Sequence, residues 1–501
     1  MSVVRFGNFS PEESAWLARA CASRSVFAPP ELCLRFGELL RLDVGGGGGG
    51  GGEREAEAPP RRRPVEPESE GRGAARGDAG ISPPAAAKVP AWGGRSESWD
   101  KRKCRDLFAA DSPGLATLAP TEYVPHGLYN YGNTCFLNSV LHAILACRDV
   151  RNVFFELDGC RFPDKAAPVL QGFVDFSRSV VVGASVEELA RRGTSLPSVS
   201  GSRGASFYPT PFEKILERFC AMTSGPGYTT PQSLPQQDAQ EFLLHALDQL
   251  HEEMIALRAK AVEECGPGGH LGGPSADGAA PEISGGLGDE WEEVGRNNKS
   301  SVTRRHDGVL DEGRKSRISS IFGGLLRSTV RVGGSKPSVC IEPFTVLQLG
   351  IASEEATGLR EALRMFSAPD YLDDYSKEGV ASKTVQIEEP PLVLVIQLLR
   401  FTYTSDGRST KITKPCEIEE DLVVGRDTLV AGPPLEYELF ATVSHHGNNL
   451  QSGHYTACVR DLSGRWHCCD DDEIWEVGQE EREEGSCDVY LALYRQKTVT
   501  L

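Results

Sequence analysis

The spacing of the apolar residues changes from a helical to a strand pattern near Ser319. Before that point, apolar residues recur three or four positions apart over Pro211 to Thr223 and over Pro235 to Ala261, which predicts amphipathic helices. After it, apolar runs are short and are separated by turn-forming residues, which predicts strands. Helices that precede a set of antiparallel strands indicate an α+β domain.

The strand-forming part of the chain contains seven clear candidates. One of them holds a continuous apolar run from Leu392 to Ile396, as expected of a strand that is buried on both faces. The predicted strands are Gly324–Val332, Phe344–Leu349, Leu392–Phe401, Tyr437–Ser444, His454–Val459, Arg465–Cys469 and Val489–Tyr494.

Two segments have compositions that do not support a packed core. Residues 1 to 110 contain a glycine run and a stretch rich in Glu, Arg, Pro and Ala, and we expect a disordered N-terminal arm there. Residues 263 to 316 are rich in glycine and charge, and we expect a flexible insertion. The folded domain is therefore predicted over residues 122 to 498, interrupted by this insertion.

A cysteine at the start of a predicted helix is the first candidate for chemistry. Cys135 follows a polar, glycine-containing loop, and Thr134 occupies the N-cap position. The unpaired N–H groups at the positive end of a helix stabilise a thiolate, which makes such a cysteine nucleophilic. Asn130 is placed to donate a side-chain N–H to an oxyanion. A packed core thiol is the ordinary alternative.

A histidine near the far end of the chain supplies the base that such a cysteine needs. His454 stands at the start of a predicted strand, directly after Gly453, and the next short strand runs into Asp470 and Asp471. Adjacent strands joined by a turn can bring His454 beside either carboxylate. A nucleophile, a base and a carboxylate that orients the base are then all available.

Three separate segments resemble the ubiquitin-specific proteases, which are cysteine deubiquitinases with a papain-like fold. They are the segment around Cys135, the segment around His454 with the terminal residues 487 to 494, and residues 236 to 242. The resemblance implies a helical thumb that carries Cys135, a β palm that carries His454, and β fingers that grip ubiquitin. It also implies hydrolysis of the isopeptide or peptide bond after the C-terminal glycine of ubiquitin.

The same resemblance assigns roles to further residues. Aligned on Trp466, the triad carboxylate is Asp470, and Asp471 is a second candidate or an oxyanion residue. The resemblance places Gln237 and Asp238 at the ubiquitin tail, although an acid in a first turn also caps a helix without any ligand. Cleavage after Gly-Gly needs a narrow slot, and two further candidates are expected to shape it. Gly453 lets the backbone come close, and the ring of Tyr455 is expected to roof the slot.

A narrower resemblance, to the ubiquitin carboxyl-terminal hydrolase 10 branch, rests on residues 251 to 254, 289 to 304 and 321 to 324. In that branch, a phenylalanine-glycine-acid-phenylalanine motif docks on the nuclear transport factor 2-like domain of a Ras GTPase-activating-protein-binding protein. The matching residues of this chain are Phe6, Gly7 and Phe9, and Asn8 stands in place of the acidic residue.

The overall charge narrows the class of partner. The formal net charge is −18, which argues against a nucleic-acid or anionic-membrane surface.

The longest apolar run, from Leu392 to Leu399, is too short to span a bilayer and is broken by Gln397. The first residues lack the apolar core of a signal peptide, so we expect a cytoplasmic protein that also enters the nucleus.

The cysteines argue against a structural metal. The chain has 14 cysteines but no Cys-x-x-Cys pair, and Cys340 stands alone where the finger strands are expected. We therefore expect no structural zinc and no cofactor. Histidines and cysteines also gather in sequence near the C-terminus, but their spacing fits no familiar zinc pattern. That group comprises His445, His446, His454, His467, Cys468 and Cys469.

Three alternatives to an active deubiquitinase remain open. A catalytically silent ubiquitin-binding scaffold would lack Cys135, His454 or Asp470, and all three are present. A thiol enzyme of the same fold could act on another ubiquitin-like modifier or catalyse a transglutaminase-type reaction, but residues 236 to 242 and the palm strands argue against the transglutaminase. An adaptor recruited through Phe6 and Phe9 is partly compatible with the enzyme.

Overall fold

The computed structural model describes residues 99–108, 121–183, 206, 209–224, 236–265, 291–294, 301–305 and 315–497, with short internal gaps. These gaps are residues 131, 159, 164–165, 334–335, 373–380, 404–408 and 450–451. All described residues belong to one compact unit, Ser82–Leu501. Most of the predicted arm, including Phe6, Gly7 and Phe9, lies outside the described residues. Residues 99–108 are described and contain the helix α3 (Lys101–Leu107), so the prediction of a disordered arm is wrong at that helix.

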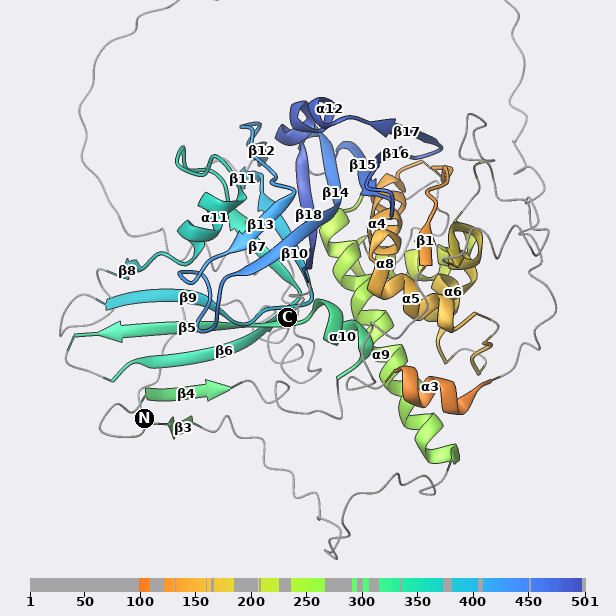
Figure 1. The fold of residues 1–501 in the computed structure, drawn as a ribbon, viewed down its shortest axis with the longest axis horizontal. Helices are drawn as coiled ribbons and strands as arrows, with labels where there is room; N and C mark the ends of the chain where they lie inside the picture. Colours follow the sequence, from red (N-terminus) through yellow and green to blue (C-terminus); the bar gives the residue numbers. More distant parts are fainter. Residues whose placement is uncertain are drawn as a thin grey trace, which may run out of the picture. The chain divides into compact units, whose positions relative to one another are not determined.

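Helices form one side of this unit and pack around α4 (Figure 1). Every residue of α4 is buried, and Phe136 on this helix contacts Phe219 and Phe242 at ring-centroid distances of 6.2 and 5.4 Å. The long helix predicted from Pro235 begins instead at Ala239, because Asp238 caps it. The elements are α3 (Lys101–Leu107), α4 (Cys135–Ala146), α5 (Arg148–Glu156), α6 (Pro168–Val180), η2 (Thr210–Phe212), α8 (Glu213–Ser224) and α9 (Ala239–Cys265).

An eight-stranded sheet packs against these helices. Its strand order is β17-β16-β15-β14-β18-β10-β7, and β13 also pairs with β14. All its pairs are antiparallel except β10 with β7. The strands are β7 (Val346–Gly350), β10 (Val393–Leu399), β13 (Asp421–Val424), β14 (Leu435–Asn449), β15 (Ser452–Arg460), β16 (Trp466–Asp470), β17 (Glu473–Val477) and β18 (Val489–Gln496).

The apolar run at Leu392 to Ile396 is buried on both faces of β10, as the sequence predicts. Val393 and Val395 pack in the core against the helices. Leu394 and Ile396 pack in a second core, which is closed by α11 (Leu359–Phe366). The sheet therefore separates two hydrophobic cores, and α4 and β15 meet in the one that holds Cys135.

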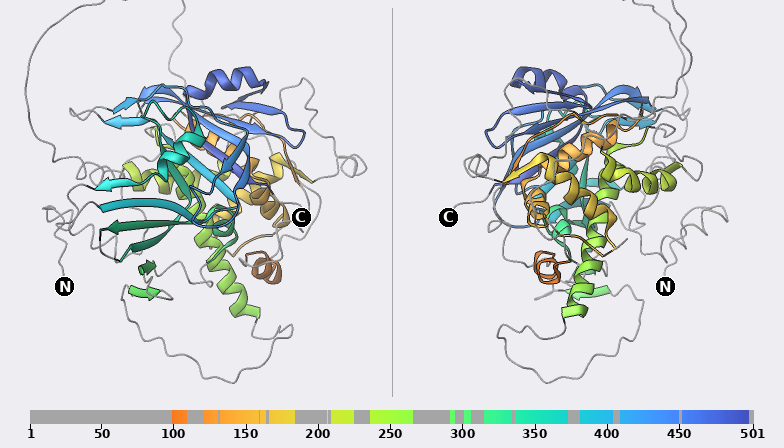
Figure 2. Two further views of the ribbon diagram at one scale, coloured as in Figure 1. Left: turned by 60° about the vertical axis from the view of Figure 1, so that its left-hand side comes forward. Right: turned by 90° about the vertical axis from the view of Figure 1, so that its right-hand side faces the viewer.

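A six-stranded sheet, in the order β3-β4-β6-β5-β9-β8, projects beyond the first sheet (Figures 1 and 2). Its strands are β3 (Trp291–Val294), β4 (Ser301–Arg305), β5 (Gly324–Val332), β6 (Ser338–Phe344), β8 (Asp370–Leu372) and β9 (Ala381–Glu389), and α10 (Arg317–Phe322) precedes β5. Of these strands, only β5 is predicted from the sequence. Because β3 and β4 lie inside residues 263 to 316, the prediction of an insertion without regular structure is wrong at those two strands.

Smaller elements complete the described fold. Two short ladders pair β1 (Thr121–Tyr123) with β2 (Val181–Gly183), and β11 (Phe401–Tyr403) with β12 (Ser409–Lys411). The helix α12 (Gln479–Glu484) and the turn η5 (Gly485–Cys487) join β17 to β18. Among the described residues, no helix is both long and apolar enough to cross a membrane.

Candidate active site

The loop before α4 is folded around the side chain of Asn130. Its Oδ1 accepts hydrogen bonds from the backbone N–H groups of Gly132 and Thr134, at 2.8 and 3.0 Å, and from the Thr134 hydroxyl at 3.1 Å. Gly132 has a φ of +133°, a conformation that glycine adopts without strain. Thr134 holds the N-cap position without a side-chain capping bond, and Cys135 begins the helix with only 3 % of its surface exposed.

Asp471 joins this loop to the turn between β16 and β17. Its Oδ2 accepts a 2.9 Å hydrogen bond from Asn130 Nδ2, and its Oδ1 accepts a 2.8 Å hydrogen bond from Asn138 Nδ2. Its backbone carbonyl accepts a 2.7 Å hydrogen bond from the N–H of Leu128. Asp471 has a φ of +50°, and these three bonds hold that uncommon conformation. In this structure, the Asn130 amide predicted to serve an oxyanion is donated to Asp471.

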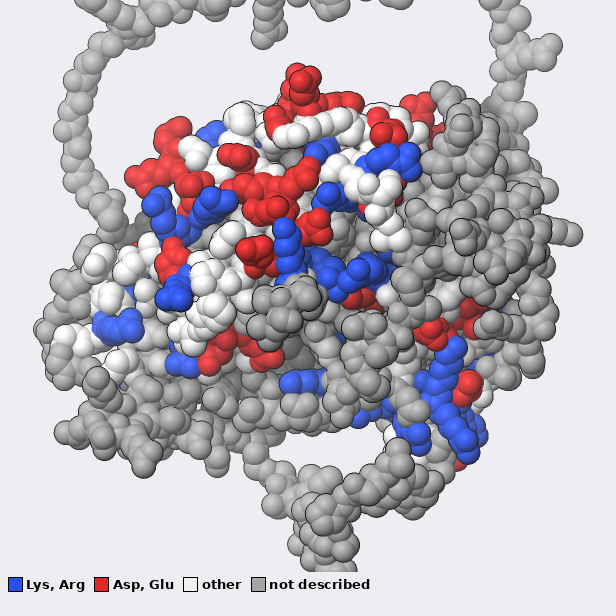
Figure 3. All heavy atoms as spheres, viewed as in Figure 1, with Lys and Arg blue, Asp and Glu red and all other residues white. Residues whose placement is uncertain are grey.

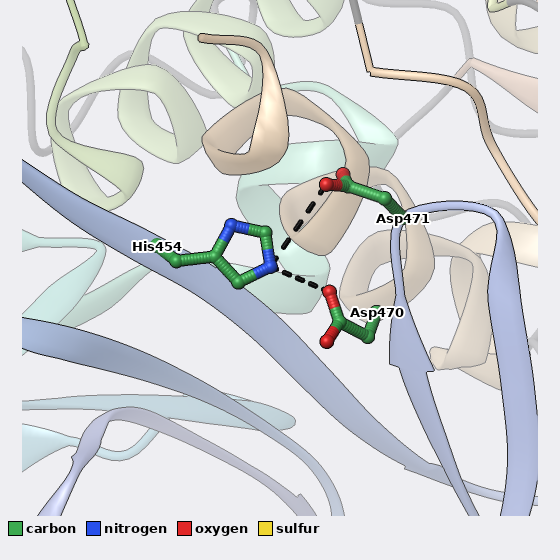
Figure 4. Close-up of side chains that lie close together, drawn as sticks. All are labelled: His454, Asp470 and Asp471. Carbon is green, nitrogen blue, oxygen red and sulfur yellow. Dashed lines mark hydrogen bonds and ion pairs between the residues drawn. The ribbon is translucent and has the colours of Figure 1, made fainter. Parts of the chain in front are cut away.

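His454 is held by the neighbouring carboxylate, Asp470. The His454 Nε2 and Asp470 Oδ1 lie 2.5 Å apart, while Asp471 Oδ2 is 3.9 Å from the same nitrogen (Figure 4). His454 comes from β15 and Asp470 from the end of β16, and these strands pair in antiparallel register. Asp470 is thus the direct hydrogen-bond partner of the imidazole. Asp471 instead accepts hydrogen bonds from Asn130 and Asn138.

Cys135 completes the arrangement through a hydrogen bond to His454. Because Nε2 is engaged by Asp470, the nitrogen that remains for the sulfur is Nδ1. The hydrogen bond with Cys135 is the largest influence on His454; together with Asp470 it outweighs partial burial and raises the histidine pKa to about 9. A protonated imidazole at neutral pH stabilises a neighbouring thiolate, so the geometry supports a thiolate–imidazolium pair.

The backbone at Gly453 is enclosed by residues of the paired strand β14. A Cβ atom at Gly453 would lie 2.4 Å from the carbonyl oxygen of His446 and 2.6 Å from Nε2 of His445. The N–H of Gly453 donates a 2.8 Å hydrogen bond to Gln236 Oε1, in front of α9. Burial lowers the pKa of His445 to about 4, so a neutral imidazole lies beneath this glycine.

Tyr455 lies under the surface rather than over a slot. Its side chain is 1 % exposed, and its ring lies 4.7 Å from the ring of His445 and 6.3 Å from that of Tyr490. The expectation that its ring roofs the slot is therefore wrong for this structure. Tyr455 supports the backbone of Gly453 and His454 from within the core.

Asp238 caps α9 and also connects this helix to the large sheet. Its Oδ1 accepts hydrogen bonds from the N–H groups of Gln240 and Glu241, at 2.7 and 3.1 Å, and its Oδ2 accepts a 2.7 Å bond from the Tyr490 hydroxyl. Burial raises the pKa of this carboxyl. The capping interpretation of Asp238 is therefore realised, and Gln237 lies buried beside it.

Sequence reasoning missed a second histidine–aspartate contact beside the first. His446, directly opposite His454 in the β14–β15 pairing, lies 3.1 Å from Asp488 Oδ2 through Nδ1 and 2.9 Å from the Thr456 hydroxyl through Nε2. The buried Lys411 side chain pairs with Asp488 at 2.5 Å. The two consecutive histidines were a visible signal, but nothing in the sequence connects them to Asp488.

One group in the described part of the chain has ligand-type atoms close enough for a metal ion. It consists of His454, Asp470 and Asp471, whose atoms lie within 4.8 Å of one another. Hydrogen bonds to Asn130 and Asn138 already use both oxygens of Asp471, and the Nε2 of His454 is paired with Asp470. The arrangement is that of a base and its orienting carboxylate.

Comparison with known proteins gives one family. The sequence profile of the family "Ubiquitin carboxyl-terminal hydrolase" matches residues 126–494. Ubiquitin carboxyl-terminal hydrolase 24 of Arabidopsis thaliana is 33% identical over 71% of this chain and 62% of its own length. Ubiquitin carboxyl-terminal hydrolase 10 of Rattus norvegicus is 33% identical over 75% of this chain and 48% of its own length. The chain thus spans less than two thirds of either relative.

Solved structures agree on the fold. A SAGA DUB module containing Ubp8 bound to monoubiquitin is similar over 75% of this chain and 70% of that chain, with a TM-score of 0.51 and 21% identity. The yeast SAGA DUB module gives the same TM-score over 75% of this chain and 69% of that chain, with 21% identity. The predicted α+β architecture of helices, palm and fingers is confirmed.

Proposed function

Because the chain belongs to the ubiquitin carboxyl-terminal hydrolase family, we propose that it is a thiol-dependent deubiquitinase. Its reaction is hydrolysis of the isopeptide or peptide bond after the C-terminal glycine of ubiquitin. The observation that carries the proposal is the series of hydrogen bonds from Cys135 through His454 to Asp470, within residues 126–494, which match the family.

The reaction follows from the thiolate–imidazolium pair. The Cys135 thiolate attacks the glycine carbonyl carbon, and the Nδ1 proton of His454 passes to the leaving amine as the C–N bond breaks. The neutral imidazole then takes a proton from water, whose oxygen attacks the thioester and releases the glycine carboxylate. Asp470 holds the imidazole in one orientation through both steps.

The negative charge that develops on the carbonyl oxygen needs donors near the start of α4. Backbone N–H groups at the positive end of that helix are available there, and Asn130 is the side-chain candidate. Asp471 orients the Asn130 amide group by a 2.9 Å hydrogen bond. We infer that Asn130 serves the oxyanion when substrate is bound, with Asp471 as its positioning residue.

Recognition of the substrate tail depends on a small residue and on charge. The backbone of Gly453 has no side chain to exclude a Gly-Gly segment, and Gln236 and Asp238 stand near it at the start of α9. The chain carries a net charge of −18, and acidic side chains gather over α12 (Figure 3). This charge suits the arginines of the ubiquitin tail.

The proposal is tested with full-length ubiquitin that carries an electrophile in place of its C-terminal carboxylate. We expect the full chain to form one covalent adduct, and Cys135→Ala to form none. Cys340→Ser is the matched control, since this cysteine lies in β6 of the other sheet, and it should react like the unmodified chain. No adduct with folded protein would overturn the proposed activity and leave a ubiquitin-binding scaffold.

The proposal extends to a binding partner of the N-terminal residues. We propose that Phe6, Gly7 and Phe9 bind the nuclear transport factor 2-like domain of a Ras GTPase-activating-protein-binding protein. The resemblance to the hydrolase 10 branch supports this, and curated hydrolase 10 relatives are among the matches. Binding of that purified domain should be lost in Phe6→Ala/Phe9→Ala and unchanged in Cys135→Ala.

The proposed location is the cytoplasm, with a fraction in the nucleus. The acidic composition and the free cysteines of the described residues suit a reducing compartment. Imaging of the tagged full chain tests this proposal. Confinement to the secretory pathway would contradict it.

A further inference from the structure

Two cysteines face each other across the strands that carry the base and its carboxylate. Cys458 of β15 and Cys468 of β16 are directly opposite in the antiparallel register. Alternate residues of a strand point to the same face, so Cys458 shares a face with His454, and Cys468 shares a face with Asp470. The two thiols therefore lie on the same side of the hairpin as the His454–Asp470 pair.

The backbone separation of this pair suits a disulfide. Directly opposed residues in antiparallel strands have Cα atoms about 4.5 to 5.5 Å apart. Disulfides form at Cα separations of about 4.4 to 6.8 Å, so the strands need not move apart or slide. The two thiols also interact, because a side-chain hydrogen bond between them is the largest influence on the pKa of each.

Both thiols are partly exposed, so a small oxidant can reach them. Their neighbour Cys469 is different, because it points to the opposite face and is 1 % exposed. Burial raises the pKa of the Cys469 thiol, which keeps it protonated and unreactive. The hairpin therefore offers one reactive pair and not three equivalent cysteines.

The surroundings favour a thiolate at Cys458. The hydrogen bond from Cys468 is the largest influence that lowers the Cys458 pKa, and the positive charge of Arg482 and a hydrogen bond with Thr442 act in the same direction. Arg482, from α12, is held nearby with its guanidinium carbon 4.3 Å from the centre of the Trp466 ring. The opposing influences are burial and Glu481.

We propose that Cys458 and Cys468 form a site of reversible oxidation, which a peroxide converts to an intramolecular disulfide. The Cys458 thiolate attacks one peroxide oxygen, the O–O bond breaks, and the sulfur becomes a sulfenic acid as the other oxygen leaves as water or alcohol. The Cys468 thiol then attacks that sulfur, the S–S bond forms, and a water molecule leaves. Two thiols are oxidised and one peroxide is reduced.

The disulfide would fix the register that holds His454 against Asp470. Cys458 lies on β15 with His454, Cys468 lies on β16 with Asp470, and the cross-link closes the short loop between these two strands. Cross-links restrict the unfolded chain and so stabilise the folded hairpin. The modification does not depend on the proposed hydrolase activity, and it is measured without a ubiquitin substrate.

The test uses the full chain with Cys135→Ala, so that oxidation of the proposed nucleophile does not interfere. The protein is treated with hydrogen peroxide, its free thiols are alkylated, and its peptides are mapped by mass spectrometry. We expect a cross-link between residues 458 and 468 that dithiothreitol reverses. It should disappear in Cys458→Ser and in Cys468→Ser, and persist in Cys340→Ser.

A second measurement guards against variants that fail to fold. The oxidised Cys135→Ala protein should unfold at a higher temperature than its reduced form, and this difference should vanish on reduction. Full alkylation of both cysteines, at a peroxide dose that oxidises Cys135 in the unmodified chain, would overturn the proposal. A cross-link of either cysteine to a different cysteine would overturn it as well.

Discussion

Two neighbouring carboxylates, Asp470 and Asp471, have different neighbours although the sequence presents them as one acidic run. Asp470 ends β16 and faces the imidazole at 2.5 Å. Asp471 follows in a backbone conformation with a φ of +50°, which turns its side chain toward the amides of Asn130, in the loop before α4, and Asn138, in α4 itself. The sequence could not assign these roles by itself, because they depend on the turn geometry after β16.

Replacing Asp470 with Asn should lower activity and change its pH dependence. His454 has a pKa raised to about 9, so the active imidazolium is present below that pH and is lost as the pH rises through it. Asp470 is one cause of this rise. In Asp470→Asn, the alkaline decline of kcat/KM should therefore move to lower pH, and kcat should fall on the order of 100-fold. An unchanged alkaline decline would contradict the assigned pair.

Replacing Asp471 with Asn should give a different pattern. One of its two amide partners would then face an N–H group instead of an oxygen, at a cost of about 1–3 kcal/mol. We expect a lower melting temperature and a lower kcat, while the alkaline decline of kcat/KM stays near its original pH. A shift as large as that of Asp470→Asn would mean that Asp471 is the true partner of His454.

At the scale of elements, the pairing of β14 with β15 determines how much space surrounds the backbone next to His454. The sequence predicts that Gly453 admits the substrate, but the structure adds a reason inside the chain. The space for a Cβ atom is already taken by His446 and His445 of the paired strand. A single sequence does not reveal such a contact, because it depends on the register of two strands.

Gly453→Ala should therefore disturb this hairpin. The added methyl group would lie 2.4 Å from a backbone oxygen, so the strands must shift, and overpacking of this kind costs about 1–3 kcal/mol. We expect a large loss of kcat/KM and a lower melting temperature. Gly478→Ala is the matched control, because a Cβ atom there meets nothing within 4 Å. Equal effects of the two substitutions would refute this explanation.

Two of the strands that the sequence does not predict, β6 and β9, share a physical reason. In β9, only Ala381 and Ile387 are fully buried, and charged and polar residues occupy most other positions. In β6, Pro343 and Glu342 interrupt the apolar pattern. Both strands belong to the sheet that projects from the body, where pairing with neighbours replaces the core as the main constraint. Apolar periodicity is weak in such strands.

At the scale of the whole molecule, long-range contacts hold the two ends of the domain together. The hydrogen bond between Asn130 and Asp471 joins residues 341 positions apart, and Arg495 pairs with Asp149 across 346 positions at 2.6 Å. The sequence predicted the α+β class from the change of periodicity at Ser319. The sequence could not predict these long-range contacts, because no local pattern encodes which distant residues meet.

Arg400 is the clearest test of this long-range framework. Its side chain is fully buried and donates hydrogen bonds to the carbonyls of Val489, Ile412, Lys414 and Ser486, which belong to two separate segments. Lysine cannot reproduce the planar arrangement of donors. We expect Arg400→Lys to lower the free energy of unfolding in urea by about 2–4 kcal/mol, because buried carbonyls lose their partners.

An exposed arginine in a strand provides the comparison for this substitution. Arg331 of β5 makes one side-chain hydrogen bond, 3.1 Å to the Thr384 hydroxyl. Arg331→Lys should change the free energy of unfolding by less than about 0.5 kcal/mol. A similar small change in Arg400→Lys would show that the buried guanidinium does not hold the segments together.

The most direct test of the central claim is cleavage of lysine-linked di-ubiquitin by the purified full chain, measured beside Cys135→Ala. Both proteins should show the same melting behaviour, so that only the nucleophile differs. The proposed function predicts release of mono-ubiquitin by the unmodified chain and no release by the variant. Equal release by both proteins, or none by a correctly folded unmodified chain, would contradict it.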